Sequence, residues 1–545
     1  MRAAARAEEH RNGAPAGPDA DGRLPLGDDR SHRKQGGQRP HLSIGRGPVE
    51  GGAAVEVHAN VGDRDAGGGD RRRQDGVAGR VRVDGTGRHH AHAEGERQHD
   101  AQRQQALSDQ ASEQESEHRH PWPPPDYTEV VRRTVAGWPA RNRLLGWASR
   151  AARPDRGVIP VDRPEIILAP GPTPIPPEVL LAQGGPLVYH RGPGFGGLMR
   201  DVTARLRTLY RAERARILLL TASGTGGLES AIQNCFSPGD EVFVPLAGFF
   251  AERWARLADA FRLTVHPLEE EWGTRLDPDR VADALARDPG IKGVLLTHSE
   301  TSTGVIQPVR ELARVSREAG AMVLVDVVSS LGAVPFAFDE WGIDVAIGGS
   351  QKALSASPGI SFVAISDRAW GAAQGAENPR FYFDWREYQR FADLPDPENP
   401  WTPAISVMQG LHAALELYFQ DGVDAALLRH QRLSRAVKEG VRALGLDLFG
   451  EGLDDNWTVT AIRAPEGISA DTICDRIRSD LGVVLAPGQG PLKGKVFRIG
   501  HFGYVSELDI IRGLAALEMT LERLDHPVKR GAAVAAAEQV FQEAH

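Results

Sequence analysis

Residues 322–354 read MVLVDVVSSLGAVPFAFDEWGIDVAIGGSQKAL, and this stretch is the clearest indication of the fold class. It contains two short runs of apolar and small residues, MVLVDVV at 322–328 and VAIGGS at 345–350. Continuous apolar runs of this kind are typical of strands that are buried on both faces. They predict a mainly parallel sheet covered by helices, and therefore an α/β protein.

Similar short apolar runs occur on both sides of this stretch. Five further apolar runs alternate with patterns of helical spacing, which brings the expected sheet to seven strands. Functional residues in such a sheet lie just beyond the strand ends. The further strands are expected at 215–221, 241–246, 262–268, 293–298 and 361–366, and helices at about 226–235, 251–261, 278–287 and 308–318.

Composition divides the chain into four segments. Residues 1–120 contain no Phe, Trp, Tyr or Cys, and ten of the eighteen histidines lie there. We therefore expect residues 1–160 to be a disordered extension and linker, or the product of a start codon that was assigned too early. A large domain is expected over 161–421 and a smaller α+β domain over 422–530, followed by a tail over 531–545.

Overall composition narrows the class of protein. The chain has 545 residues, of which 41% are hydrophobic and 25% charged, as in ordinary globular proteins. There is no apolar run of about 18 residues for a membrane span, and the N-terminus lacks the apolar region of a secretory signal. The only cysteines, Cys235 and Cys474, exclude a disulfide scaffold and a multi-cysteine zinc site. A net charge of −9 argues against nucleic-acid binding. We expect a cytoplasmic enzyme for small metabolites, without a metal.

A glycine-rich turn follows the strand at 215–221. Its sequence is Ser223-Gly224-Thr225-Gly226-Gly227, and a helical pattern begins there. A turn between a strand and a helix presents backbone N–H groups and the positive end of the helix dipole, which suits a phosphate. The pattern is neither a P-loop nor GxGxxG, and glycines are common in α/β loops, so the turn alone is weak evidence.

Two charged residues stand at the ends of the strands in the opening stretch. Asp326 ends an apolar strand, so its carboxylate needs a strong partner or solvent; a helix cap or a surface ion pair would also satisfy it. Lys352 follows a buried strand and small residues, where loss of solvation lowers the pKa of an amine and frees it as a nucleophile. A turn that can bind a phosphate, an aspartate and a lysine are together what pyridoxal 5′-phosphate requires.

In this combination the chain resembles the class V aminotransferases of fold type I, and most closely the alanine–glyoxylate and serine–glyoxylate (serine–pyruvate) enzymes. The resemblance covers about 164–525. It implies a large domain with a mainly parallel seven-stranded sheet and a smaller C-terminal domain. The motifs that carry it are LAPGPTPIPPEVL, YHRGPGF, TASGTGGLES, LTHSETSTGVIQP, VLVDVVSSLGAVPF, GIDVAIGGSQKAL and GKVFRIGHFG.

The resemblance implies roles for the residues of the reactive centre. Lys352 matches the lysine that forms the Schiff base and transfers the proton, and Asp326 matches the partner of the pyridine nitrogen. Val328 would pack under the ring. Phe250 falls at the ring-stacking position, where some relatives have Trp, and Thr301 falls where a hydroxyl lies near the 3′-oxygen. Phe250 as plain core and Thr301 as a turn residue are the alternatives.

The resemblance also implies residues that bind the two anionic groups. Those for the cofactor phosphate are Ser223, Gly224 and Thr225, assisted by Gln351. Arg498 matches the arginine that pairs with the substrate carboxylate, which a guanidinium fork suits; an interdomain salt bridge is its alternative role.

Other family positions border the pocket or come from a neighbouring subunit. Pro170 and Gly171 resemble the N-terminal loop beside the substrate, with Gly171 a candidate for substrate binding. His190 and Arg191 lie near the entrance in relatives, and we assign them no role. Thr402 is the candidate that a partner subunit sends to the phosphate, because the family builds its active site at a homodimer interface.

The implied reaction moves an amino group from alanine or serine to glyoxylate or pyruvate. Aspartate, phosphoserine and ureidoglycine remain possible donors, although no basic cluster for a second phosphate is visible. A cysteine desulfurase-like lyase would need a reactive thiol, whereas Cys235 and Cys474 lie in helical patterns. A non-catalytic regulator would be favoured by loss of the lysine or the aspartate, and both are present.

Overall fold

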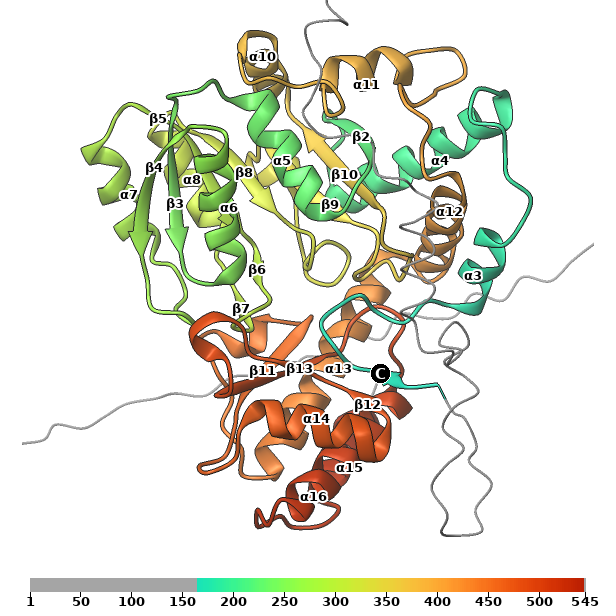
Figure 1. Ribbon diagram of the computed structural model, residues 1–545, viewed down its shortest axis with the longest axis vertical. Coiled ribbons are helices and arrows are strands. Elements are labelled where there is room, and N and C mark those ends of the chain that lie inside the picture. Colours follow the sequence, from blue (N-terminus) through green and yellow to red (C-terminus); the bar gives the residue numbers. More distant parts are fainter. Residues whose placement is uncertain (1–163, 544–545) are drawn as a thin grey trace, which may run out of the picture. The chain divides into compact units, whose positions relative to one another are not determined.

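The computed structural model describes residues 164–543, and a seven-stranded sheet forms the middle of the larger region, in the upper part of Figure 1. Its strand order is β2-β10-β9-β8-β5-β3-β4. All neighbouring strands are parallel except β10, which is antiparallel to both β2 and β9. The strands are β2 (Arg216–Thr221), β3 (Glu241–Leu246), β4 (Thr264–Glu269), β5 (Ile291–Thr297), β8 (Met322–Asp326), β9 (Val345–Gly349) and β10 (Ile360–Ile365).

The sheet is buried on both faces, as its continuous apolar strands predict. Successive residues of a strand point to opposite faces, and in β10 Phe362 joins one hydrophobic cluster while Val363 joins another. Helices that cover the first face are α4 (Pro193–Tyr210), α7 (Pro278–Arg287), α8 (Val309–Glu318) and α12 (Ile405–Gln420). Helices that cover the second face are α5 (Gly224–Cys235), α6 (Phe249–Ala260), α10 (Asp367–Gly375) and α11 (Trp385–Ala392).

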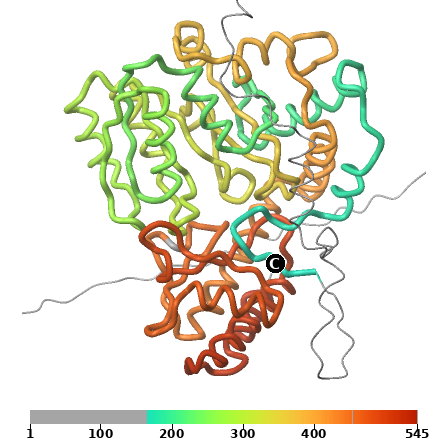
Figure 2. The backbone as a smooth tube through the Cα atoms, in the orientation of Figure 1, coloured from blue at the N-terminus to red at the C-terminus, as the bar shows by residue number. Residues whose placement is uncertain are grey.

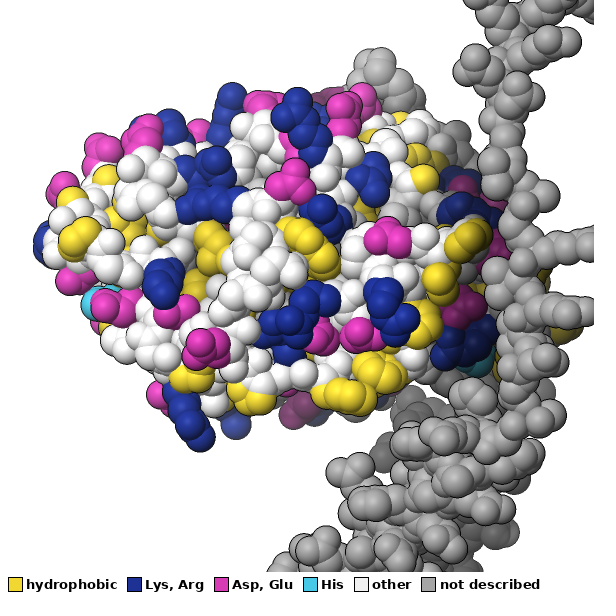
Figure 3. All heavy atoms as spheres, turned by 90° about the horizontal axis from the view of Figure 1, so that it is seen from above, with side chains coloured by type: hydrophobic (Ala, Val, Ile, Leu, Met, Phe, Trp, Pro, Cys, Tyr) yellow, Lys and Arg dark blue, Asp and Glu magenta, His cyan; other side chains and the backbone are white. Residues whose placement is uncertain are grey.

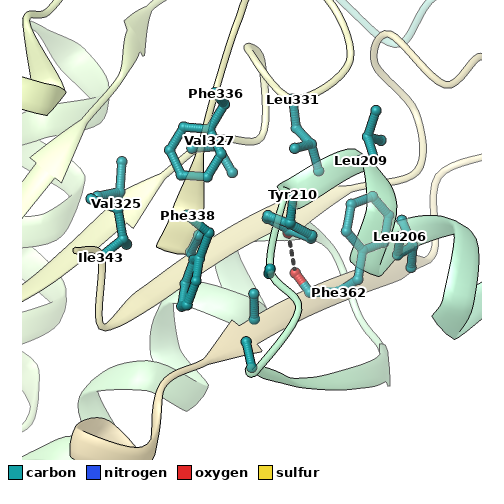
Figure 4. Close-up of a cluster of buried hydrophobic side chains, with 14 of the residues drawn as sticks. Leu206, Leu209, Tyr210, Val325, Val327, Leu331, Phe336, Phe338, Ile343 and Phe362 are labelled. Carbon is teal, nitrogen blue, oxygen red and sulfur yellow. Dashed lines mark hydrogen bonds between the residues drawn. The ribbon is translucent and has the colours of Figure 1, made fainter. Parts of the chain in front are cut away.

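Figure 4 shows part of the first cluster, where Tyr210 of α4 packs edge-on against Phe336 and Phe362. The Tyr210 hydroxyl donates to the carbonyl of Phe362 at 3.0 Å. This buried polar group therefore has a partner, and it ties α4 to β10. Two short elements, α3 (Pro177–Gln183) and α9 (Phe338–Trp341), and the hairpin of β6 (Ser299–Glu300) and β7 (Val305–Ile306) complete this region.

The C-terminal region has its own hydrophobic cluster around a three-stranded sheet of order β11-β14-β13. Its strands are β11 (Val459–Arg463), β13 (Ala486–Pro487) and β14 (Val496–Gly500). Its helices are α13 (Val423–Ala443), α14 (Ala470–Leu481), α15 (Glu507–Arg523) and α16 (Ala532–Gln542), with 3₁₀ turns at Leu453–Asp455 and Gly490–Leu492.

Two features of this region differ from the expected segments. The residues that we expected to be a tail form α16, which buries Ala533, Ala537 and Val540, because its small apolar face fits against α13 and α15. The strand β1 (Ile166–Ile167) pairs with β12 (Val483–Val484), so the first described residues pack with the C-terminal ones (Figure 2). Leu168, which follows β1, is 1% exposed within the same cluster.

The lysine loop joins β9 to β10 in residues 350–359. Since β10 is antiparallel, this loop makes a short return at one edge of the sheet. Ser350 closes it: its N–H donates to the carbonyl of Ile360 at 3.0 Å, and its hydroxyl donates to the carbonyl of Ser357 at 2.6 Å. The loop is thus fixed at both ends.

The surface carries mixed charge. On the face seen in Figure 3, basic and acidic side chains are interspersed over the described residues. Among these residues, no helix has both the length and the apolar character required to cross a membrane.

Candidate active site

A cavity of about 270 Å³ lies at the carboxyl ends of the parallel strands, where polar residues of β8, the lysine loop and the start of α5 meet. Functional residues were expected just beyond these strand ends. Nine of the residues proposed for cofactor or substrate line it: Gly171, Ser223, Gly224, Thr225, Phe250, Asp326, Val328, Gln351 and Lys352.

Lys352 reaches the cavity from the lysine loop. Its Nζ donates to the carbonyl of Pro170, so the N-terminal loop lies directly against the amine. Thr173 holds the backbone of the same residue, since its Oγ1 donates to the carbonyl of Lys352 at 2.8 Å. Burial is the main cause that lowers the pKa of Lys352 to about 8; the carboxylate of Asp326 opposes this shift, and the cations of Arg498 and Arg253 add to it.

Gly171 leaves the space that the lysine occupies. A Cβ at this position would lie 2.6 Å from Lys352 Nζ, and the backbone has a φ of +118°, which side chains rarely tolerate. The backbone conformation therefore favours glycine here, and any larger residue would also have to displace the flexible end of the Lys352 side chain. Gly171 thus lines the cavity, and Pro170 contacts the amine through its carbonyl oxygen.

Asp326 is the last residue of β8 and is 6% exposed. Its Oδ1 accepts the N–H of Val328 at 2.8 Å, which fixes the carboxylate at the cavity wall. Burial raises its pKa to about 6, although the hydrogen bond from Val328 and the charges of Arg253 and Lys352 act in the opposite direction. A cationic ring nitrogen beside it would offset that desolvation.

The glycine-rich turn forms the first turn of α5. Ser223 is the N-cap residue, with extended backbone and no hydrogen bond from its side chain to the helix. The first N–H groups of a helix have no partners within it, so these donors face the cavity edge. Gly224 allows Val328 to pack closely, because a Cβ there would lie 2.6 Å from its Cγ2.

Phe250 is the second residue of α6 and lines the cavity. A buried carboxylate fixes the start of this helix: Glu300 Oε2 accepts the N–H groups of Phe250 and Ala251, each at 3.1 Å. The same carboxylate accepts the hydroxyl of Ser302 at 2.5 Å. The position of Phe250 is thus set from β6, and sequence reasoning missed Glu300, although it stands in the quoted motif HSETSTG.

Arg498 and Thr301 lie beside the cavity but are not among its lining residues. Arg498, on β14, donates to the carbonyl of Thr301 at 3.0 Å and to that of Pro487 at 2.8 Å. Its Nε is buried and has no hydrogen-bond partner among the described residues. Glu300 is the carboxylate that acts on its charge there, and the two form no ion pair at salt-bridge distance. The Thr301 hydroxyl donates to Ser329 Oγ at 2.7 Å, so Ser329 rather than Thr301 faces the cavity.

The other expected residues lie outside the cavity wall in the described chain. Thr402 is exposed in the segment before α12. Arg191 pairs with Glu398, with 2.5 Å between Nη1 and Oε2, and the ring of His190 lies edge-on to Tyr189. None of these three lines the cavity that Lys352 enters.

Six lining residues were not expected from the sequence: Pro172, Leu228, Arg253, Ser299, Ser329 and Pro358. Arg253 is the charged one among them. It stands three residues after Phe250 on α6, a spacing that puts both on one side of the helix. This spacing is the feature of the sequence from which Arg253 could have been predicted to line the cavity.

Comparison with known proteins identifies the family. The family described as aminotransferase class V matches residues 177–483. The chain belongs to the class V aminotransferases, and it is a pyridoxal phosphate-dependent aminotransferase that acts on amino acids and keto acids.

Three curated relatives differ in name but match over nearly their whole length. A protein of Synechococcus sp. (strain PCC 6716) named soluble hydrogenase, small subunit, is 39% identical over 70% of this chain and 99% of its own. An L-aspartate–glyoxylate aminotransferase of Paracoccus denitrificans is 36% identical over 69% of this chain and 96% of its own. A serine–glyoxylate aminotransferase of Methylorubrum extorquens is 36% identical, with the same coverage of 69% and 96%.

A solved structure supports the same fold. The ureidoglycine–glyoxylate aminotransferase of Bacillus subtilis aligns with a TM-score of 0.67 at 29% identity, over 71% of this chain and 100% of its own. The expected fold type I architecture, with its mainly parallel sheet, is thereby confirmed.

The residues of the cavity fit pyridoxal phosphate. The buried Gln351 Oε1 has no hydrogen-bond partner among the described residues, and the Ser223 side chain does not cap its own helix. Together with the free N–H groups of α5, these polar groups form what we call the phosphate cradle, at one end of the cavity. Asp326 and Lys352 also line the cavity. Lys352 would hold the cofactor covalently, Asp326 its ring nitrogen, and Ser223 and Thr225 its phosphate.

Proposed function

We propose that this aminotransferase transfers the amino group of a small L-amino acid, alanine or serine, to a small 2-oxo acid, glyoxylate or pyruvate. The observation that carries the proposal is the juxtaposition of a buried lysine of lowered pKa, a strand-end carboxylate and a buried arginine that forms no salt bridge among the described residues. The similarity to enzymes whose names include glyoxylate supports the acceptor.

Lys352 and Asp326 have different roles toward the cofactor and the substrate. The bound cofactor supplies an aldehyde that an amine can attack and a ring that draws electrons from the reacting carbon. Lys352 would hold the cofactor covalently until the substrate amine replaced it. Its freed amine would then be the base that takes the proton from the substrate Cα and the acid that returns it. Asp326 keeps the ring nitrogen protonated, and the second half of the reaction runs these steps in reverse.

Arg498 is the proposed site for the substrate carboxylate. Its guanidinium donates to two backbone carbonyls, which orient the fork without neutralising its charge. A substrate carboxylate beside the cavity would form stronger, ionic hydrogen bonds with the guanidinium, on which only Glu300 acts as an anion among the groups that shift its pKa.

Aspartate and ureidoglycine donors are the main alternatives, since relatives carry those names. Among the lining residues only Lys352 and Arg253 are cations, so an aspartate side chain would have to use Arg253. A cysteine desulfurase-like activity is disfavoured, because burial raises the pKa of the thiols of Cys235 and Cys474 and keeps both protonated.

We further propose a homodimer in the cytoplasm, with Thr402 of each subunit serving the phosphate site of the other. Beside the exposed Thr402, Phe381 stacks on Trp401 at 4.8 Å between ring centroids and is 76% exposed. An exposed aromatic patch of this kind suits a subunit interface. The two free cysteines agree with a reducing compartment. Light scattering of the holoprotein tests the assembly: a monomer that is active would overturn this part.

A spectral half-reaction tests the substrates. The holoenzyme is mixed with alanine, serine, aspartate or glutamate in turn, and the visible absorption band of the lysine-bound cofactor is followed. We expect alanine or serine to remove the band and glyoxylate to restore it. Conversion by aspartate and not by alanine or serine would overturn the choice of donor. The matched variant K352A should show no such band at all.

A further inference from the structure

Arg253 is a cation of the cavity wall to which neither the family motifs nor the reaction assign a role. Its Nη1 donates to Thr225 Oγ1 at 3.1 Å, and its Cζ lies 4.7 Å from the centroid of the Phe250 ring. The guanidinium therefore extends from the ring-stacking residue on α6 to the glycine-rich turn at the start of α5. It spans the end of the cavity where the phosphate cradle lies.

Arg253 forms no ion pair with a carboxylate in the described part of the chain. Its hydrogen bond goes to a neutral hydroxyl, and none of the ion pairs among residues 164–543 includes it. Nevertheless it is close enough to both Asp326 and Lys352 to lower the pKa of each. A partly buried cation that faces a cavity and has no carboxylate within ion-pair distance is suited to an anionic ligand.

The phosphate cradle needs such a charge. Its other groups are the hydroxyls of Ser223 and Thr225, the amide of Gln351 and the N–H groups of the α5 first turn, all of them neutral. A phosphate monoester carries close to two negative charges at neutral pH. Lys352 cannot neutralise them, because its nitrogen is committed to the covalent bond with the cofactor.

We propose that Arg253 binds the phosphate of pyridoxal phosphate and supplies the positive charge of that subsite. The fork of the guanidinium offers five N–H groups, of which one donates to Thr225, so the same residue can hold the turn and the anion together. This inference rests on the cofactor and not on the choice of donor amino acid. Its test is therefore independent of the substrate test above.

The experiment compares two ligands that differ only in the phosphate. Apoprotein of the wild type and of R253Q is titrated with pyridoxal phosphate and with pyridoxal, and each Kd is read from the absorption of the lysine-bound ligand. We expect R253Q to weaken pyridoxal phosphate by about tenfold to a hundredfold, the range for a hydrogen bond to a charged group. The Kd of pyridoxal should change less than about twofold. R253K should fall between R253Q and the wild type.

R256Q is the matched control. Arg256 is exposed on the same helix, with its Cζ 5.5 Å from the ring centroid of Phe249, and it does not line the cavity. Both Kd values should stay at the wild-type level in this variant. Thermal melting of each apoprotein shows whether the helix still folds, and the ratio of the two Kd values within one variant is independent of any loss of folded protein.

Inorganic phosphate gives a second readout. In the wild type it should strengthen pyridoxal binding by occupying the empty phosphate subsite, and in R253Q this effect should disappear. Equal weakening of both ligands by R253Q would overturn the proposal, because Arg253 would then act only through the Phe250 ring. An unchanged Kd for pyridoxal phosphate together with a raised KM for aspartate would also overturn it, and would make Arg253 a substrate residue.

Discussion

At the residue scale, the surroundings of Lys352 set the pKa of its amine. Lys352 is held between the carbonyl of Pro170, the carboxylate of Asp326 and the cations of Arg498 and Arg253. Only the neutral amine can attack an aldehyde. Because burial lowers its pKa to about 8, a useful fraction is neutral near physiological pH.

This shift predicts the pH dependence of cofactor capture. The rate at which the apoprotein binds pyridoxal phosphate should rise with pH as Lys352 loses its proton, and it should level off above about pH 8. An ordinary lysine would keep the rate rising to about pH 10. Stopped-flow absorption between about pH 6.5 and pH 10 measures this profile. A rate that still rises at the upper end of this range would show that burial does not control the amine.

A substitution at Gly171 can distinguish the effect of backbone strain on stability from the effect of a clash with Lys352 on cofactor capture. G171A should slow cofactor capture, because the added Cβ would lie 2.6 Å from Lys352 Nζ and the amine would have to move away from its present position. G239A is the control: Gly239 has a φ of +88°, and no heavy atom lies within 4 Å of the position that a Cβ would take there. Both variants should lose about 1–3 kcal/mol of stability to backbone strain. Denaturation midpoints and the visible band are the measurements, and normal capture by G171A would contradict the steric account.

The same scale shows what the sequence could and could not predict at the site. Asp326, Lys352 and the turn at Ser223 follow from their positions at strand ends, since parallel strands bring those ends together. Arg253 was missed because an arginine on an amphipathic helix ordinarily faces solvent. Thr301 was expected at the cofactor, yet its hydroxyl donates to Ser329, a tertiary partner that no local pattern reveals.

At the element scale, α6 begins on a carboxylate supplied by a hairpin distant in sequence. Glu300 of β6 is 1% exposed and accepts the first N–H groups of the helix, where its negative charge also meets the positive end of the helix dipole. The element that carries Phe250 and Arg253 is thus fixed at its start.

This cap predicts the effect of E300Q. The amide would turn an NH₂ group toward N–H donors, so we expect a loss on the order of 2 kcal/mol in stability. The circular dichroism of the bound cofactor should also change, because the Phe250 ring shifts. E252Q is the control, since Glu252 lies in the first turn of α6 but is only partly buried. Equal stability of E300Q and E252Q would argue against the cap.

Element boundaries were predictable where apolar runs were long. The seven strands of the central sheet lie within two residues of their expected bounds, because burial on both faces leaves an unmistakable pattern. The order of the strands did not follow from the sequence, nor did the antiparallel direction of β10. Helix α16 was missed because its alanine-rich segment gives little amphipathic contrast.

At the scale of the whole molecule, the described residues contain every group assigned to the reaction. All candidate site residues lie within 164–543, and the family match spans 177–483. Two hydrophobic clusters cover the faces of the large sheet and a third fills the C-terminal region. Arg498 joins them, since it extends from β14 to the carbonyl of Thr301.

Truncation tests this arrangement. A protein that lacks residues 1–160 should fold and bind pyridoxal phosphate as the full chain does, as judged by the visible band and the melting temperature. A protein that lacks residues 1–168 should melt at a lower temperature, because it loses the pairing of β1 with β12 and the buried Leu168. Failure of the first protein to bind the cofactor would mean that the N-terminal segment contributes to the site.

The antiparallel strand β10 has a consequence for catalysis. A parallel connection from β9 would have needed a crossover of a dozen or more residues, whereas the lysine loop returns at once and is closed by Ser350. A long connection would let the amine sample many positions, and each productive encounter would then carry an entropy cost. Here that disorder is removed when the chain folds, before any substrate arrives. The direction of one strand thereby raises the effective concentration of the amine at the reacting carbon.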